Sequence, residues 1–336
     1  MAINKRSKII IWCSISIAII SAVIGFTYAT SITNADTESS IINYDLESKS
    51  KYQAIVDNEV ELIPKDSIES ILFMDINTGE ILAGYGDVYK EFEPGSIFKI
   101  LTFAMSLKEN SVKPKDMYDC KGRLNVDGKI FYCWNFKGHG KQTLLQGIES
   151  KCNIAAIEAA LKIGKEKFYE NLELFGLRNH DSGIELNNLN LAATSIGKGF
   201  TITPLQMASS ISALLNEGTL YKPFLDESLK NIVKIKINNN KQLALKQVAS
   251  KDVTNAIVSA LKDISIDGKI SGIGGVSDMT SDKKYITSYV ATNIEDDPKI
   301  VGVIVMNVEF KDKDLAEEAM KKIIIKCLEN NPNHLH

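Results

Sequence analysis

At residues 93–99 the chain reads Glu-Pro-Gly-Ser-Ile-Phe-Lys, and this stretch carries more information about fold and chemistry than any other. Pro94 and Gly95 end a loop, and the apolar residues that follow predict a helix over 97–107. Ser96 then stands at the start of that helix, with Lys99 one turn later on the same face. Because burial lowers the pKa of a lysine, Lys99 is a candidate base for a Ser96 nucleophile. The same spacing occurs by chance in many helices, where the serine is only an N-cap.

Further stretches accompany this motif in a fixed order. Turn residues at 77–80 between two apolar runs predict a β-hairpin over 70–83. Then follow Cys133-Trp134, Gly138-His139-Gly140, Cys152-Asn153, Gly197-Lys198-Gly199, Thr203-Pro204-Leu205-Gln206-Met207-Ala208, Asn216-Glu217-Gly218 and Pro223. From about Ile68 to Glu309 the chain resembles the transpeptidase domain of the penicillin-binding proteins, and the stretches with Cys133, His139 and Cys152 are similar to those of class B members. These proteins are serine acyltransferases that cross-link peptidoglycan.

The resemblance implies a fold and an active site. We expect an α+β fold in which an antiparallel sheet is flanked by helices and joined to an all-helical subdomain. The resemblance makes Ser96 the nucleophile, Lys99 the base and Asn153 the residue that orients the substrate. It also implies the ligands, which are β-lactams and the D-Ala-D-Ala end of a peptidoglycan stem peptide, with no cofactor and no metal ion.

Two of the three family motifs, which are Ser-x-x-Lys, Ser-x-Asn and Lys-Thr-Gly, are altered here. The second reads Lys151-Cys152-Asn153, with lysine at the place of the family's serine. At the third, an alignment on Gly275 puts Val-Ser-Asp, residues 276–278, where Lys-Thr-Gly is expected. A shift by two residues puts 273–275 there. Only an inserted residue recovers a lysine, Lys269, and it breaks the alternation by which strand residues face one side.

The missing lysine changes the expected chemistry. It would hold the terminal carboxylate of the substrate and keep positive potential over the nucleophile, so we expect weak substrate capture and slow acylation. An oxyanion hole made of backbone N–H groups would survive. Asp278 would repel the substrate carboxylate, whereas Lys151 would restore part of the lost charge unless it is only a solvated lysine. The residues expected to contact substrate are Lys151, Gly275, Val276 and Ser277.

The five cysteines contain no Cys-x-x-Cys pair, which argues against zinc-ribbon and thioredoxin-like proteins. Only four histidines are present, so a histidine-based metal site is not expected. Cys120 and Cys133 bracket a short segment with turn residues and predict a disulfide, the alternative being two reduced thiols beside a hairpin. Cys327 is expected in the core of a terminal helix, and His139 in a structural hydrogen bond.

The N-terminus predicts the compartment. Residues 4–8 are basic, and residues 9–26 form an uncharged apolar run long enough for an uncleaved membrane anchor. Cleavage near Ala29 is the alternative. The positive-inside tendency then places the rest of the chain outside the cytoplasm. We therefore predict a cytoplasmic flank and anchor over 1–29, an extracytoplasmic tether over 30–65 and a transpeptidase-like domain over 66–330.

The predicted elements of the domain alternate in type along the chain. Helices are expected over 97–107, 143–163, 166–174, 204–216, 251–263 and 314–328, and late strands over 285–293 and 299–309. Strands at both ends of a helical middle are typical of an α+β domain with a helical insert. The 336 residues, 44% of them hydrophobic, suffice for a full core.

Composition and motifs leave a short set of functions. A net charge of −3 gives no broad cationic face, so nucleic-acid binding is not expected. The first hypothesis is a transpeptidase or carboxypeptidase whose activity is weakened. The second is an impaired paralogue that scaffolds cell-wall assembly, with cell-wall synthesis proteins as partners, or senses β-lactams. A class D β-lactamase is disfavoured, because the surroundings of Ser96 and Gln206 look like those of synthases.

Overall fold

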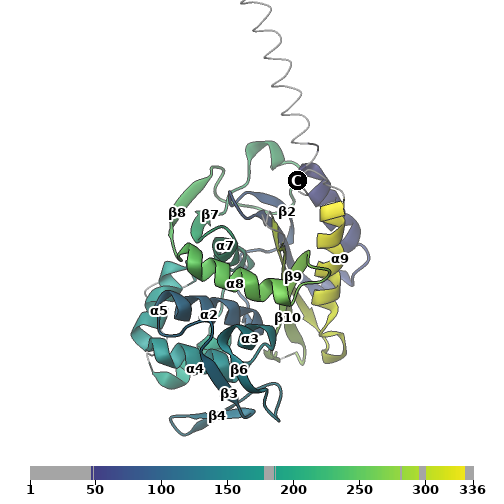
Figure 1. Ribbon diagram of the computed structural model, residues 1–336. Coiled ribbons are helices and arrows are strands. Elements are labelled where there is room, and N and C mark those ends of the chain that lie inside the picture. Colours follow the sequence, from purple (N-terminus) through teal and green to yellow (C-terminus); the bar gives the residue numbers. More distant parts are fainter. Residues whose placement is uncertain are drawn as a thin grey trace, which may run out of the picture. The chain divides into compact units, whose positions relative to one another are not determined.

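The computed structural model describes residues 47, 49–177, 185, 187–280, 282–294 and 300–329 (Figure 1). The chain divides into two units, Met1–Lys49 and Ser50–His336, and the second is described below. The predicted anchor over 9–26 lies outside the described residues. Within the described ranges, no helix has both the length and the apolar character needed to cross a membrane.

A five-stranded antiparallel sheet forms the centre of this unit, in the order β2-β1-β11-β10-β9. The strands are β1 (Ile68–Asp75), β2 (Ile81–Gly86), β9 (Ile270–Met279), β10 (Tyr285–Asn293) and β11 (Ile300–Val308). The hairpin expected near 70–83 is confirmed as β1 and β2. Its turn forms because the Asp75 carboxylate accepts hydrogen bonds from the backbone N–H groups of Asn77 and Thr78, 2.9 and 2.8 Å long.

One face of the sheet is covered by the C-terminal helix α9 (Leu315–Glu329) and by a helix over 49–60. Tyr52, Val56 and Val60 of the latter are at most 3% exposed and belong to the same apolar cluster as Met320 and Ile323 of α9. The two helices are also joined by an ion pair between Lys326 and Glu59. Residues 50–63 therefore belong to the compact unit, which begins at Ser50 rather than at residue 66.

Helices and short ribbons between β2 and β9 make up the rest of the unit. They comprise η2 (Gly95–Phe98), α2 (Lys99–Lys108), β3 (Met117–Cys120), β4 (Arg123–Val126), β5 (Lys129–Tyr132), β6 (Gly140–Thr143), α3 (Leu144–Glu149), α4 (Asn153–Ile163), α5 (Lys165–Leu174), α6 (Asn188–Ser195), α7 (Pro204–Leu215), β7 (Thr219–Lys222), β8 (Leu243–Gln247) and α8 (Lys251–Asp263). The helix predicted over 143–163 is broken at 150–152 into α3 and α4, and α6 was not predicted. The break places the second motif between two helices.

Two family-like stretches have a structural role in this fold. Thr203 and Gln206 form a capping box at the start of α7, with hydrogen bonds of 3.1 and 2.9 Å, and Pro204 occupies the first helical position. Asn216 follows the end of α7, where its side-chain amide donates to the Ile76 carbonyl oxygen over 2.7 Å. The stretch therefore fixes both ends of α7, which packs against β1 and β11.

Candidate active site

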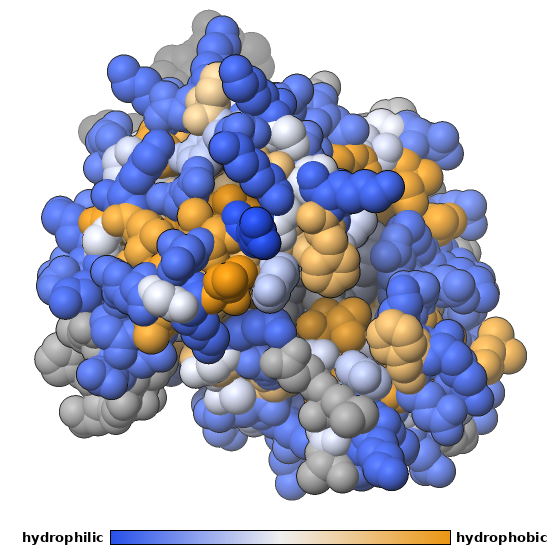
Figure 2. All heavy atoms as spheres, turned by 90° about the horizontal axis from the view of Figure 1, so that it is seen from below, coloured by the Kyte–Doolittle hydropathy of each residue, from blue (hydrophilic) through white to orange (hydrophobic). Residues whose placement is uncertain are grey.

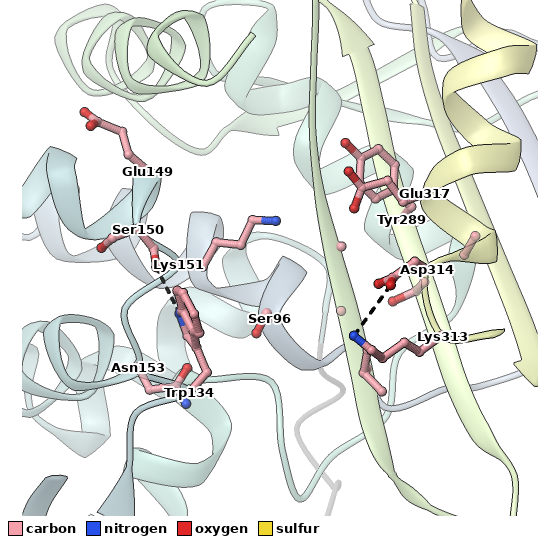
Figure 3. Close-up of a pocket in the computed structure, with 15 residues that line it drawn as sticks. Ser96, Trp134, Glu149, Ser150, Lys151, Asn153, Tyr289, Lys313, Asp314 and Glu317 are labelled. Carbon is pink, nitrogen blue, oxygen red and sulfur yellow. Dashed lines mark hydrogen bonds and ion pairs between the residues drawn. The ribbon is translucent and has the colours of Figure 1, made fainter. Parts of the chain in front are cut away.

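A cleft of about 550 Å³ contains the hydroxyl side chain of Ser96 (Figure 3). One wall comes from the segment before α4 and from the loop after β5, and includes Trp134, Lys151 and Asn153. The other wall comes from β9, β10 and the start of α9, and includes Val276 and Tyr289 among others. The fold thus brings residues of the first, second and third motif regions to one cleft.

Ser96 lies in the 3-10 turn η2, immediately before α2. Glycines hold this turn on two sides. Gly95 has a φ of 56° and its N–H donates to the Gly197 carbonyl oxygen over 2.9 Å. On the other side, a Cβ atom on Gly275 would lie 2.4 Å from the Pro94 carbonyl oxygen and 3.2 Å from the Ser96 nitrogen. Since only glycine permits these approaches, the turn that carries Ser96 is held between the loop at Gly197 and β9.

Lys99 is buried in the first turn of α2, with 3% of its surface exposed. Burial lowers the pKa of its amine to about 7, against the opposing field of Cys133 and Cys152. The amine donates to the Asn153 side-chain oxygen over 2.8 Å and to the Lys151 carbonyl oxygen. In the described part of the chain, no hydrogen bond joins Lys99 to the Ser96 hydroxyl, so the direct contact expected from their spacing is absent. About half of the amine groups are therefore uncharged near pH 7, and the amine points toward the second motif.

Asn153 is the first residue of α4 and its amide is fixed on both sides. Its oxygen accepts from Lys99, and its nitrogen donates to the Tyr132 carbonyl oxygen over 3.0 Å. Nearby, the Trp134 indole donates to the Ser150 carbonyl oxygen over 3.0 Å, which ties the loop after β5 to the second motif. These bonds hold the asparagine at the cleft in a single orientation.

Lys151 occupies the break between α3 and α4 in a left-handed conformation, with a φ of 51°. Such a conformation is costly for a residue with a side chain and persists where the surroundings enforce it. Here it turns the backbone carbonyl toward Lys99. The Lys151 side chain lines the cleft and, in Figure 3, its amine extends into the space above Ser96. A cationic side chain from the helical wall is therefore present in the cleft.

On β9 the structure separates the residues expected to contact substrate. Gly275 and Val276 line the cleft, and Val276 is 39% exposed. Ser277 is buried and is not among the lining residues, because neighbouring side chains on a strand point to opposite faces. Its hydroxyl instead accepts from the Ile286 N–H over 3.1 Å, at the register shift between β9 and β10. The side chain of Asp278 lies outside the described residues.

The cleft also receives residues that the sequence did not single out for the site. Tyr289 comes from β10, Lys313 and Asp314 come from the turn before α9, and Glu317 comes from the first turn of α9. Lys313 and Asp314 form an ion pair of 3.5 Å. No local motif marks these positions, because they reach the cleft only through the pairing of β9, β10 and β11 and the packing of α9. Trp134 carried a signal, since it adjoins Cys133 in a family-like stretch.

Exposed apolar side chains gather at the end of β5 and in the loop after it, and one of them, Trp134, lines the cleft. Figure 1 places β3, β4 and β6 at the lower end of the domain, and Figure 2 shows that end from below with apolar patches among polar side chains. Trp134, Phe136 and Tyr132 are 61%, 75% and 55% exposed. Trp134 therefore offers an apolar surface to a ligand in the cleft.

The disulfide expected between Cys120 and Cys133 is not formed. Both are buried free thiols, as is Cys152. The Cys133 sulfur lies 4.0 Å from the Cys152 sulfur and 3.6 Å from Nδ1 of His139. Cys120 and Cys133 thus lie close to Cys152 and His139 as well. The predicted disulfide considered only Cys120 and Cys133. Cys327 is 1% exposed in α9, as predicted.

Most of the chain is similar to proteins of one known family. A family model described as "Penicillin binding protein transpeptidase domain" matches residues 69–325. Stage V sporulation protein D of Bacillus subtilis (strain 168) is 31% identical over 251 residues, covering 66% of this chain and 39% of that protein. The peptidoglycan D,D-transpeptidase FtsI homolog of Mesostigma viride is 23% identical over 321 residues, covering 75% of this chain and 53% of that protein. The chain thus spans about half or less of these relatives' length.

Solved structures show the same fold. The transpeptidase domain of Burkholderia pseudomallei penicillin-binding protein 3 superposes with a TM-score of 0.68 at 19% identity, covering 85% of this chain and 95% of that one. The D,D-transpeptidase domain of a peptidoglycan glycosyltransferase from Eggerthella lenta gives 0.68 at 18% identity, covering 83% and 81%. The expected α+β architecture is confirmed.

Proposed function

The chain belongs to the penicillin-binding protein transpeptidase family, and from this premise we propose that it is a D,D-transpeptidase-type protein of peptidoglycan synthesis that forms an acyl-enzyme on Ser96. One observation carries the proposal: a buried lysine with a pKa of about 7 is bonded to Asn153 beside the cleft that contains Ser96. A serine nucleophile, a base whose pKa lies near 7 and an amide that orients the substrate are the groups that acyl transfer requires.

The reaction follows from these groups. Lys99 in its neutral form takes the proton of the Ser96 hydroxyl as the oxygen attacks the carbonyl carbon of the D-Ala-D-Ala bond or of a β-lactam ring. The C–N bond breaks, and the departing nitrogen receives a proton. An amine or water then attacks the acyl-enzyme and releases Ser96. Asn153 holds the substrate amide during both steps, and the backbone N–H groups of Ser96 and β9 face the developing oxyanion.

Substrate capture is the weak step of this scheme. Val276 presents an apolar side chain at the cleft where the motif has lysine, so β9 supplies no cation for the terminal carboxylate. Lys151 on the opposite wall supplies a charge instead. We therefore propose slow acylation by β-lactams and feeble turnover of stem peptides. The same observation favours a second candidate, a catalytically impaired paralogue that acts as a scaffold or as a β-lactam sensor.

Intact-mass spectrometry after incubation with a labelled penicillin tests the proposal. The expected result is a single acyl adduct, mapped to the peptide that contains Ser96 and missing from Ser96→Ala. Release of D-Ala from a stem pentapeptide, measured in parallel, separates the candidates: detectable release supports the enzyme, and an adduct without release supports the sensor. An adduct that persists in Ser96→Ala contradicts the proposed nucleophile, and no adduct at all leaves the scaffold role.

We place the domain in the cell envelope, outside the cytoplasmic membrane. The proposal rests on the basic flank and the apolar run of residues 9–26, and on relatives whose names refer to peptidoglycan. If the run is an uncleaved anchor, the full-length protein should fractionate with membranes. Recovery of a form that starts near Thr30 in the medium would contradict it.

A further inference from the structure

Exposed apolar side chains are concentrated at the end of β5 and in the loop that follows it. Thirteen large hydrophobic side chains of the described residues are exposed, and four of them fall within residues 130–136. These four side chains form what we call the β5 patch: Ile130, Tyr132, Trp134 and Phe136. Single exposed apolar side chains are ordinary, whereas a group of them in one place marks a binding surface.

The residues between the members of the β5 patch hold this segment in place. Phe131 and Cys133 are buried, because neighbouring side chains on a strand point to opposite faces. Cys133 donates its N–H to the Gly122 carbonyl oxygen over 2.9 Å. The Asn135 side-chain amide donates to the Gly138 carbonyl oxygen, also over 2.9 Å. The patch is therefore presented to solvent on a fixed backbone.

Two aromatic rings of the patch are neighbours with cations beside them. The ring centroids of Tyr132 and Phe136 are 6.1 Å apart, with an angle of 63° between the ring planes. Arg123 pairs with Tyr132 across β4 and β5, Lys137 follows Phe136, and both cations are exposed. Aromatic faces with hydrogen-bond donors at their edge suit a ligand that has apolar faces and a polar rim. A sugar ring has this form, with C–H groups on its faces and hydroxyl groups around its edge.

Trp134 connects the β5 patch to the catalytic cleft. It lines the cleft that contains Ser96, on the wall that also carries Asn153 (Figure 3). Its indole donates to the Ser150 carbonyl oxygen over 3.0 Å, and the Tyr132 carbonyl oxygen accepts from the Asn153 amide over 3.0 Å. The backbone of the patch is therefore bonded to the segment of the second motif, and the patch continues into the cleft.

We propose that the β5 patch binds the glycan strand that carries the stem peptide. This inference rests on the proposed function, because it takes the acyl donor to be a stem peptide attached to a sugar. Four peptide residues separate that sugar from the bond that breaks, and at about 3.3–3.6 Å per residue they reach at most about 14 Å. The sugar of a substrate bound at Ser96 therefore stays close to the cleft, where Trp134 and its neighbours offer it an aromatic surface.

Exposed aromatic and basic side chains together also bind lipid surfaces. The position of the β5 patch favours the glycan. Because Trp134 belongs both to the patch and to the cleft, a bilayer resting on the patch would cover the cleft on this side. A single sugar strand leaves the cleft open and is joined covalently to the peptide that must enter it.

Binding of glycan without stem peptides tests the proposal without any acyl transfer. The probe is a set of soluble glycan oligosaccharides from which an amidase has removed the stem peptides, titrated calorimetrically into the full-length Ser96→Ala protein. We expect saturable binding that Tyr132→Ala and Phe136→Ala each weaken about fivefold or more, whereas Phe136→Trp keeps an aromatic face and retains it. Tyr89→Ala and Leu245→Ala are the matched controls, because they remove exposed apolar side chains outside the patch and should bind as the parent protein does.

A second measurement needs no change in the patch. Hydroxyl-radical footprinting of the Ser96→Ala protein should show that the glycan protects Tyr132, Trp134 and Phe136 from oxidation and leaves Tyr89 unprotected. The proposal is overturned if the glycan neither binds nor protects the patch, or if the patch variants bind it as tightly as the control variants do.

The remaining outcomes separate the glycan from a lipid surface and this inference from the proposed function. If Tyr132→Ala and Phe136→Ala lose affinity for vesicles that contain phosphatidylglycerol but keep glycan binding, the patch is a lipid surface and the proposal is wrong. A penicillin adduct on Ser96 without glycan binding contradicts the patch and leaves the proposed function intact. Glycan binding through the patch without an adduct supports the patch and contradicts only the proposed nucleophile.

Discussion

The protonation state of Lys99 decides whether its amine can act as the base that we propose for Ser96. Its side chain extends from the first turn of α2 and is buried, and the amine donates hydrogen bonds to oxygen atoms of Lys151 and Asn153. Burial lowers the pKa of this amine to about 7. A lysine in water has a pKa near 10.4 and is charged throughout the neutral range. Here half of the population is neutral near pH 7, so a base is present at neutral pH without any further partner.

This protonation predicts the pH dependence of acylation. The neutral amine accepts the serine proton, so the rate constant for penicillin acylation should fall about tenfold per pH unit below about 7 and level off above it. Stopped samples analysed by intact mass between pH 5.5 and 9 would give the profile, and spontaneous hydrolysis of the penicillin is the blank. Lys99→Met should remove the step at every pH. A flat profile across pH 6–8 would contradict Lys99 as the base.

A positive charge placed on β9 at position 276 should increase the rate of acylation. Val276→Lys should accelerate acylation, because one charge-assisted contact contributes about 1.5–3 kcal/mol, which corresponds to roughly 10- to 150-fold in rate. Val276→Met is the matched control, since it adds length without charge and should leave the rate near that of the unchanged protein. The measurement is the second-order acylation constant. Equal rates for the lysine and methionine variants would show that Lys151 already supplies the needed charge.

The turn η2, which carries Ser96, is in close backbone contact with strand β9. Gly95 faces the Val276 backbone, and Gly275 faces Pro94 and Ser96, so η2 and β9 approach closely without side chains between them. Although β9 lacks the lysine of its motif, it keeps the glycine contact. Its backbone therefore still forms a wall of the cleft directly beside Ser96.

A pair of glycine variants tests this contact. A Cβ on Gly275 would lie 2.4 Å from the Pro94 carbonyl oxygen, whereas a Cβ on Gly274 would lie 3.2 Å from the nearest atom, in the Tyr289 ring. We expect Gly275→Ala to displace η2 and lower the acylation constant at least about tenfold, since small misplacements of reacting groups have effects of this size. Gly274→Ala should cost much less. Similar losses in both variants would mean that β9 does not position Ser96.

Elements with local signals were predictable from the sequence. The hairpin at Asp75, the capping box of Thr203 and Gln206, and the placement of Ser96 at a helix start each depend on residues within a few positions of one another. The break at Lys151 was not predicted, because a left-handed lysine between helices has no distinctive sequence. The meeting of Cys120, Cys133, His139 and Cys152 was not predicted either, because these side chains come together only when β3, β6 and α4 pack.

The start of the domain was predicted wrongly because its helix is recognised only by its packing in the whole fold. Residues 30–65 are polar on average and were assigned to a tether. Yet Tyr52, Val56 and Val60 recur every four residues, which is the spacing of a helix with one apolar face. In the structure this face packs on the sheet beside α9, and Gln53 exchanges two hydrogen bonds with the backbone of Gly84, 2.9 and 3.1 Å long.

These contacts predict where the chain can be shortened. A protein that begins at residue 47 should keep the stability of the domain, because it retains the helix over 49–60. A protein that begins at residue 66 loses Tyr52, Val56 and Val60 from the core, each worth about 1.5–3 kcal/mol when fully buried, and uncovers the backbone of the edge strand β2. We expect it to unfold at a clearly lower urea concentration or to aggregate. Gln53→Ala in the longer protein should cost about 1–3 kcal/mol, because it leaves the buried Gly84 backbone groups unpaired, whereas Lys51→Ala on the exposed side of the same helix should cost little. Equal urea midpoints for the two shortened proteins would show that the helix is dispensable and that the domain begins at residue 66 after all.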